Sequence, residues 1–419
     1  MTRDLHYSTR PARSARLRPA IFHLLLFLLA GANLYAATYT WNVLLSAPAG
    51  TYNWSTPTNW SPNGVPGAGD DVIIPSSRRP VTLDVNASVQ SITISSTLSL
   101  GANNLTVARF GGSFSFSGSV TGTTGFLTVE VTDWTALNSL RSYNATLQPR
   151  VIHRLMNDLN SSTAGYASLA SASANAGAGW TPIANQRAQF DGNNRTIADL
   201  NINSTSDQRG LFGNLWASVQ NLTLANVNIV GGDQIGALAG AVINVALTNV
   251  SSSGSVTGIS YVGGLVGQYY GTAATPGLIS GCSSSASVTG NSSETRYVGG
   301  LFGQVSYGTV ANCSASGAVT VNSNSEGSYG YAGGLVGQAF DATFTDCSAS
   351  GDVTSTVGFG DNSRYLGGFA GYITATDPKT YTRCYANGNI STQGAFNGGF
   401  VGLIEAGNDP SIFSSVYFV

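Results

Sequence analysis

The chain is poor in charged residues, and this shortage excludes one class of partner. Charged residues make up 9% of its 419 residues, against about 25% in an average soluble protein. Lys379 is the single lysine, and the formal net charge is −2. Binding to nucleic acid depends on clustered lysine and arginine side chains. We therefore expect no nucleic-acid partner.

Histidine and cysteine are also scarce, which limits catalytic and metal chemistry. Of three histidines, two lie near the N-terminus and the third is His153. A zinc site of the H-E-x-x-H type needs two histidines one helical turn apart. A Ser-His-Asp triad would have to use His153, and no G-x-S-x-G motif supports one. We therefore predict no enzymatic activity, no metal and no cofactor.

Only one hydrophobic run stands out, and it lies near the N-terminus. Five arginines precede the apolar stretch from Ala20 to Ala32, and small residues end it. This pattern predicts a signal peptide over residues 1–36, cleaved after Ala32 or Ala36, and hence a secreted or cell-surface protein. The alternative is an uncleaved anchor, although spanning a bilayer takes about 20 apolar residues. Removing the leader would leave 13 basic and 19 acidic groups, a net charge of −6.

Glycine, in contrast, is abundant, with 52 residues, and it recurs in a fixed octet. "YVGGLVGQ" at Tyr261 returns as "YVGGLFGQ" at Tyr297, "YAGGLVGQ" at Tyr331 and "YLGGFAGY" at Tyr365. Related units share a final glycine at Gly213, Gly240, Gly267, Gly303, Gly337, Gly371 and Gly402. Internal repeats with periods of this kind are typical of solenoids and other repeat architectures. A phosphate-binding loop is excluded by context, because no helix follows the octet.

The residues between octets repeat as well. "ISGCSSSASVTG", "VANCSASGAVT" and "FTDCSASGDVT" align without gaps, and their apolar positions lie at even offsets. Positions at even offsets share one face of a strand. The inward columns we predict include Cys282, Cys313, Cys347 and Cys384, and also Leu265, Leu301, Leu335 and Phe369. The pattern predicts an all-β fold: a parallel β-solenoid over residues 201–419, with strands of successive coils about 4.8 Å apart.

Upstream of these repeats the pattern changes. Residues 37–125 alternate apolar and polar positions between turns, which predicts a β-rich N-terminal region. Residues 126–200 predict an irregular connecting region with a short helix, for which Thr132 or Asp133 is the N-cap.

The octets, followed by "NCSASG", resemble the GLUG repeat family. The resemblance covers about residues 190–419. It implies a bacterial protein that is secreted or exposed at the cell surface, often adhesin-like and usually without an assigned activity. The first two units depart from the pattern because Leu222 and Val250 stand where later units have cysteine.

Candidate binding residues lie in the longer loops between repeats. Glu326 and Tyr329 belong to one such loop, and Phe359, Asp361 and Arg364 to another. Insertions in repeat proteins often fall on the binding face, and an exposed aromatic residue beside polar groups would suit a sugar ring. The alternative is that these are variable loops without a ligand.

Two further questions stay open at this level. The four cysteines fit either buried free thiols or disulfides between coils. The last coil is incomplete at "SIFSSVYFV", so we expect either a truncated chain or self-association through an open solenoid edge.

The sequence thus favours a secreted or surface-exposed, adhesin-like rod that presents loops to an extracellular glycan or to the surface of a host or neighbouring cell. The alternative is a carbohydrate-active β-helix enzyme, a polysaccharide lyase or hydrolase, or its sugar-binding module. Such enzymes gather acidic and basic side chains on one face. The candidate carboxylates, Asp70, Asp71, Asp341 and Asp346, fit turns better, because Asp346 shares its column with Asn and Gly.

Overall fold

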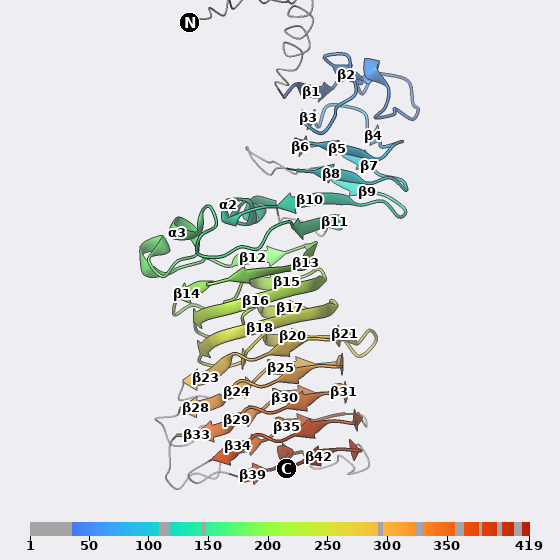
Figure 1. Cartoon of the computed structure of the whole chain (residues 1–419). Helices are drawn as coiled ribbons and strands as arrows, with labels where there is room; N and C mark the ends of the chain where they lie inside the picture. Colours follow the sequence, from blue (N-terminus) through green and yellow to red (C-terminus); the bar gives the residue numbers. More distant parts are fainter. Residues whose placement is uncertain are drawn as a thin grey trace, which may run out of the picture.

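The chain folds into a rod of parallel β-coils, each coil being one turn of a solenoid (Figure 1). The computed structural model describes residues 36–108, 118–143, 148–291, 296–322, 330–356, 364–376, 379–391, 396–405 and 413–419. The strands succeed one another down the rod in sequence order. The predicted parallel β-solenoid is confirmed. The predicted leader, except for Ala36, lies outside the described residues.

One wall of the rod is an eight-stranded parallel sheet, called the central sheet, whose labels run down the middle of Figure 1. Its strands, in order, are β12 (Ile183–Gln186), β15 (Phe212–Leu215), β17 (Ala239–Ile243), β20 (Val266–Tyr270), β25 (Phe302–Ser306), β30 (Val336–Phe340), β35 (Ala370–Thr374) and β40 (Val401–Ile404). From β15 onward, the second residue of every strand is the last glycine of an octet or related unit. The seven glycines aligned from sequence therefore stand in one structural column.

A second wall, the long sheet, begins with strands that range from 3 to 12 residues in length. These are β5 (Ala87–Val89), β8 (Leu105–Val107), β10 (Leu127–Val131), β11 (Gln148–Leu155), β13 (Ala188–Ala198), β14 (Asn201–Asn203), β16 (Val219–Val230) and β18 (Leu247–Gly258). All of their pairings with one another are parallel.

Further down the rod, four coils each contribute three short strands to the long sheet instead of one long strand, and the last described coil contributes two. They are β21 (Gly277–Ser280), β22 (Ser283–Ser284) and β23 (Ser287–Asn291); β26 (Gly308–Ala311), β27 (Ser314–Ala315) and β28 (Val319–Asn322); β31 (Thr343–Thr345), β32 (Ser348–Ala349) and β33 (Val353–Ser355); β36 (Tyr381–Thr382), β37 (Tyr385–Ala386) and β38 (Ile390–Ser391); and β41 (Phe413–Ser414) and β42 (Tyr417–Phe418).

The third wall, the side sheet, is formed by the first half of each octet. Its strands are β19 (Val262–Gly263), β24 (Arg296–Gly299), β29 (Gly330–Gly333), β34 (Arg364–Gly367) and β39 (Phe396–Gly398). Two glycines then turn the chain toward the central sheet. The two residues that follow, such as Leu301 and Phe302, are both fully buried, so the alternation of inward and outward side chains is interrupted at this corner.

The top of the rod contains the predicted β-rich region. Strands β2 (Trp60–Ser61), β1 (Thr38–Trp41), β3 (Asp71–Ile74) and β6 (Ser91–Ile94) form one sheet, and β4 (Val81–Thr82), β7 (Thr97–Ser99) and β9 (Ser119–Thr121) form another. Only β1 and β2 pair in the antiparallel sense among the named strands of the described residues. Trp41 and Trp54 pack edge-on against Trp60 with ring centroids 4.8 Å apart, and all three are fully buried. Residues 57–59 form a short 3-10 turn, η1 (Pro57–Asn59).

Residues 126–200 are more regular than the sequence predicts. Strands β10, β11 and β13 continue the parallel stack through this stretch, so the stack extends upstream of residue 201. The predicted helix is present as α2 (Trp134–Ser139), and its N-cap Asp133 accepts a hydrogen bond from the Ala136 amide at 2.8 Å. An excursion carries η2 (Leu140–Tyr143), α3 (Tyr166–Leu169) and η3 (Ala174–Gly177). The absence of octet glycines hid these coils from the repeat pattern.

Apolar columns fill the interior of the rod. Leu265, Leu301, Leu335 and Phe369 are fully buried, as the octet alignment predicts. Each buried aliphatic side chain contributes about 1.5–3 kcal/mol relative to exposure. A coil shares these contacts with the coils above and below, so neighbouring coils stabilise one another.

Candidate functional site

The octet places a tyrosine and a glutamine in two neighbouring columns that are largely covered, since Tyr331, Gln268 and Gln338 are 9% exposed or less. Tyr261, Tyr297, Tyr331, Tyr365 and Phe396 form one column along the side sheet. Their ring centroids are 5.2–5.4 Å apart, and from Tyr297 to Phe396 the ring planes lie within 12° of parallel. Burial raises the pKa of Tyr297 to about 12. The first residue of each octet thus belongs to one aromatic column.

Glutamine side chains run beside this column as a hydrogen-bonded ladder. Gln208 donates to Gln234 at 3.0 Å, and Gln234 donates to Gln268 at 2.6 Å. The ladder continues from Gln268 to Gln304 and from Gln304 to Gln338. Each amide donates to the next one down the rod, so the ladder has a single direction and its side chains are held in fixed positions.

In the octets, the glycine that precedes Gln268, Gln304 and Gln338 allows this arrangement. A Cβ on Gly303 would lie 2.5 Å from both the Gly267 carbonyl oxygen and the Tyr261 carbonyl carbon. The backbones of the side and central sheets therefore touch at this point, and no larger residue fits without a shift.

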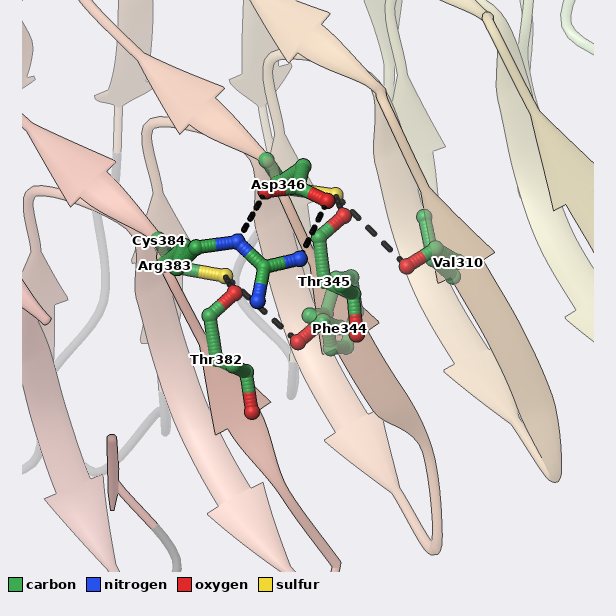
Figure 2. Close-up of polar contacts among 8 residues, drawn as sticks. Val310, Phe344, Thr345, Asp346, Thr382, Arg383 and Cys384 are labelled. Atoms are coloured by element: carbon green, nitrogen blue, oxygen red, sulfur yellow. Dashed lines mark hydrogen bonds and ion pairs between the residues drawn. The ribbon is translucent and has the colours of Figure 1, made fainter. Parts of the chain in front are cut away.

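The four cysteines form a buried column of free thiols. The Cys347 thiol donates to the Val310 and Thr345 carbonyls, and the Cys384 thiol donates to the Phe344 and Thr382 carbonyls (Figure 2). Hydrogen bonding to the Cys313 thiol, together with burial, raises the pKa of Cys347 to about 12. A thiol of this kind is not nucleophilic near neutral pH. Of the two alternatives for the cysteines, the structure has the buried thiols.

The residue before each position of the cysteine column, where Leu222, Val250 and Val416 stand in three coils, turns the corner of the long sheet in the left-handed conformation. Its φ lies between 51° and 64° in seven coils, at Asn221, Asn249, Gly281, Asn312, Asp346, Arg383 and Ser415. Asparagine, aspartate and glycine tolerate this conformation best, so the predicted turn role of Asp346 is confirmed.

Arg383 forms two hydrogen bonds of 2.6 Å to Asp346 from the next coil (Figure 2). These bonds lower the pKa of Asp346. Of the other predicted turn carboxylates, Asp70 accepts from the Gly67 amide and Asp341 accepts from the Thr376 amide and hydroxyl, whereas Asp71 opens β3 and accepts from the Ser91 hydroxyl.

The predicted loop residues are not brought together in the described part of the chain. Glu326, Tyr329, Phe359 and Asp361 lie outside the described residues. Arg364 begins β34, and only its backbone is described. The loop hypothesis therefore stays a prediction.

His153 lies inside the rod. It is fully buried, and its Nδ1 lies 2.9 Å from Nε2 of Gln186. Burial lowers its pKa to about 3, so the imidazole is neutral at any physiological pH. Among the described residues no group of three or more His, Cys, Asp and Glu side chains is placed to hold a metal ion.

The outward face of the central sheet carries aromatic residues that the repeat alignment missed. Trp216 and Tyr270 are each 37% exposed, and Phe340 is half-buried. Each follows an octet-type glycine by three residues, as in "GNLW", "GQYY" and "GQAF". Reading three positions past each glycine would have found them. Within the described residues, no helix is long and apolar enough to span a membrane.

These walls and columns define the chain as a parallel β-solenoid repeat protein. Within it, the GLUG motif model matches residues 258–289, 294–322 and 328–354, which confirms the resemblance seen in the octets. The matched segments carry three of the four cysteines and the first three residues of the tyrosine column.

Two known proteins are similar to parts of the chain. Halomucin from Haloquadratum walsbyi is 34% identical over 160 residues, which is 36% of this chain and 2% of halomucin. A crystal structure from Bacteroides ovatus, titled "putative immunoglobulin A1 protease", aligns with a TM-score of 0.48 and 19% identity. That alignment covers 64% of this chain and 83% of the other.

Proposed function

We propose that the chain is the rod of an extracellular or cell-surface protein that binds other surfaces and catalyses no reaction. The main support is the constant register of its surface columns: the same side-chain types recur at the same height in successive coils. Such a rod offers many weak, identical contacts instead of one reactive pocket, and linked weak contacts add up to strong attachment.

Export is part of this proposal. It is supported by the predicted leader, by the GLUG motifs and by the likeness to halomucin over 36% of the chain. A polar surface with little charge suits contact with extracellular glycans or with the surface of a neighbouring or host cell. The experiment for location is antibody labelling of intact cells that express the chain. Labelling that appears only after the cells are lysed would contradict export.

Binding and catalysis are separated by a second experiment. Beads coated with the purified chain should adhere to cells or immobilised polysaccharides more than beads coated with an unrelated protein. The same polysaccharides, incubated with soluble chain, should release no reducing ends or unsaturated products. Product release would favour the carbohydrate-active β-helix enzyme, and failure of the beads to adhere to any tested surface would contradict the adhesive role.

A further inference from the structure

The central sheet presents an aromatic side chain on its outward face at every second coil. Residues in register from β17 to β30 are Ile243, Tyr270, Ser306 and Phe340. Trp216 follows Leu215, the partner of Val242, and so stands opposite Ile243. We call the column of these five residues the aromatic strip. Since adjacent strands lie about 4.8 Å apart, Trp216, Tyr270 and Phe340 recur at roughly 10 Å along the rod.

Polar neighbours hold the rings of the aromatic strip in place. The Trp216 Nε1 donates to Oδ1 of Asn185 at 3.2 Å, and the Arg187 guanidinium lies 5.0 Å from the Trp216 ring centroid. The Tyr270 hydroxyl donates to Gln268 and accepts from Gln234. Rings fixed before binding lose little conformational entropy when a ligand arrives.

Phe340, the third ring, is fixed by packing instead of hydrogen bonds. It contacts the Tyr307 ring edge-on, with centroids 5.3 Å apart at 78°. The aromatic strip is thus a preformed row of three rings, and the two smaller residues, Ile243 and Ser306, lie between them.

Within its strands the strip carries no charged side chain, and the charged group beside it is Arg187, which lies over the Trp216 ring. Strands β15, β17, β20, β25 and β30 contain no Asp, Glu, Lys or Arg. A neutral ligand therefore suits this face better than an anionic or cationic one, because a charged ligand would lose hydration without gaining an ion pair. Beside the strip, the half-buried ladder residues Gln234 and Gln304 add amide groups, which match hydroxyl groups.

One neutral ligand has the repeat of this strip. In an extended β-1,4-linked glycan, successive sugars are turned by half a rotation, so every second sugar presents the same face. Two such sugars span the same length as two coils of the rod. The apolar C–H face of every second sugar could then stack on an aromatic ring, while the hydroxyl groups along its edges meet the amides.

We propose that the aromatic strip binds a neutral β-1,4-linked glycan lying along the rod axis, with alternate sugars stacked on Trp216, Tyr270 and Phe340. This inference rests on the proposed adhesive function and names the ligand class and the face that binds it. Cellulose and chitin share this geometry and differ in the N-acetyl group of chitin.

The test is co-sedimentation of the purified chain with microcrystalline cellulose and with chitin. We expect binding to at least one of them that persists at molar salt, since no ion pair is involved. The single variants Trp216→Ala and Tyr270→Ala should each weaken binding about tenfold or more. Binding to cellulose alone or to chitin alone would identify the source, and binding to neither would overturn the proposal.

Tyr385→Ala is the matched control. Tyr385 is also 37% exposed, but it lies in β37 on the long sheet. Its removal should leave glycan binding unchanged, and thermal unfolding should show that all three variants remain folded. Equal loss of binding in Tyr385→Ala would overturn the assignment to this face. If coated beads still adhere to cells while Trp216→Ala and Tyr270→Ala do not affect that adhesion, the glycan inference fails and the adhesive function stands.

Discussion

At the octet glycines, adding a single carbon atom to the side chain is enough to cause a clash with the backbone. At Gly303 an added methyl group would meet two backbone atoms at 2.5 Å. Backbone on both sides cannot move away without disturbing the side sheet and the central sheet together. The repeated glycine is therefore a packing requirement, and the tyrosine and glutamine beside it are brought together as a consequence.

Replacing one of these glycines should cost stability. We expect Gly303→Ala to lower the free energy of unfolding by about 1–3 kcal/mol, the usual range for overpacking. Denaturant unfolding followed by circular dichroism measures the change. Gly50→Ala is the matched control, because nothing lies within 4 Å of the added atom, and its effect should stay within about 0.5 kcal/mol. Equal stability of the two variants would contradict the close approach.

The buried thiols should make stability depend on alkaline pH. The pKa values of Cys313, Cys347 and Cys384 are raised in the folded chain, and that of Cys282 is lowered. As pH rises past the ordinary thiol pKa of about 8.5, the unfolded state loses these protons first. The three thiols whose pKa is raised therefore contribute their full stabilisation below about pH 8.5, and this contribution is lost as the pH rises above that value.

Measuring unfolding at about pH 7 and about pH 9.5 tests this linkage. The free energy of unfolding should fall over this interval, and a variant with all four cysteines changed to alanine should show a smaller fall. The two proteins are compared by how steeply the free energy of unfolding changes with pH. Truncating the buried side chains lowers the free energy of unfolding by the same amount at both pH values, so it does not affect this comparison. Identical slopes in the two proteins would contradict the raised pKa values.

At the scale of the element, the corner of the long sheet is set by backbone conformation more than by contacts. Seven residues share the left-handed φ, and five of them are asparagine, aspartate or glycine. Arg383 and Ser415 are the exceptions. Arg383 is bound to Asp346, so a side-chain contact accompanies the less favourable backbone.

A β-branched residue at this corner should be poorly tolerated. Asn312→Val is expected to destabilise the chain by about 1–2 kcal/mol, because the two methyl groups on the valine Cβ crowd the backbone in the left-handed conformation, which asparagine tolerates. Asn312→Gly should be near neutral, since glycine adopts positive φ without this cost. Thr309→Val serves as the control, because it lies exposed in β26 of the same coil. A neutral Asn312→Val would show that the corner does not need this conformation.

The elements that could be predicted from sequence are those that repeat. The inward columns and the corner column were visible because several units carry the same residue type at the same offset. Strands β10, β11 and β13 were not, since they stack in the same way without octet glycines. The aromatic strip was missed for a different reason. Trp216, Tyr270 and Phe340 occur in every second coil, so an alignment that looks for the same residue type in every coil does not detect them.

At the scale of the whole molecule, the rod is a one-dimensional stack in which each coil contacts chiefly its neighbours. Strands of one coil pair with the corresponding strands of the next in unbroken register from β18 to β38. Stability in such a stack is close to a sum of coil and interface contributions. The number of coils can therefore change without changing the fold of any one of them.

Deletion of residues 313–346 tests this modularity. The segment is one complete coil, from Cys313 to the corner residue Asp346, and its removal joins Asn312 to Cys347. Both new neighbours keep their columns, so the inward face stays in register. We expect a folded rod that is shorter by one strand spacing of about 4.8 Å, with unchanged β-sheet circular dichroism per residue and a smaller denaturant m-value, since less surface is exposed on unfolding.

The control deletion of residues 313–345 removes one residue fewer and places Asp346, directly after Asn312, in the cysteine column. That one-residue shift turns side chains from the core face to the solvent face, and it should prevent cooperative unfolding. If both deletions unfold alike, coil register does not determine the stability of the stack.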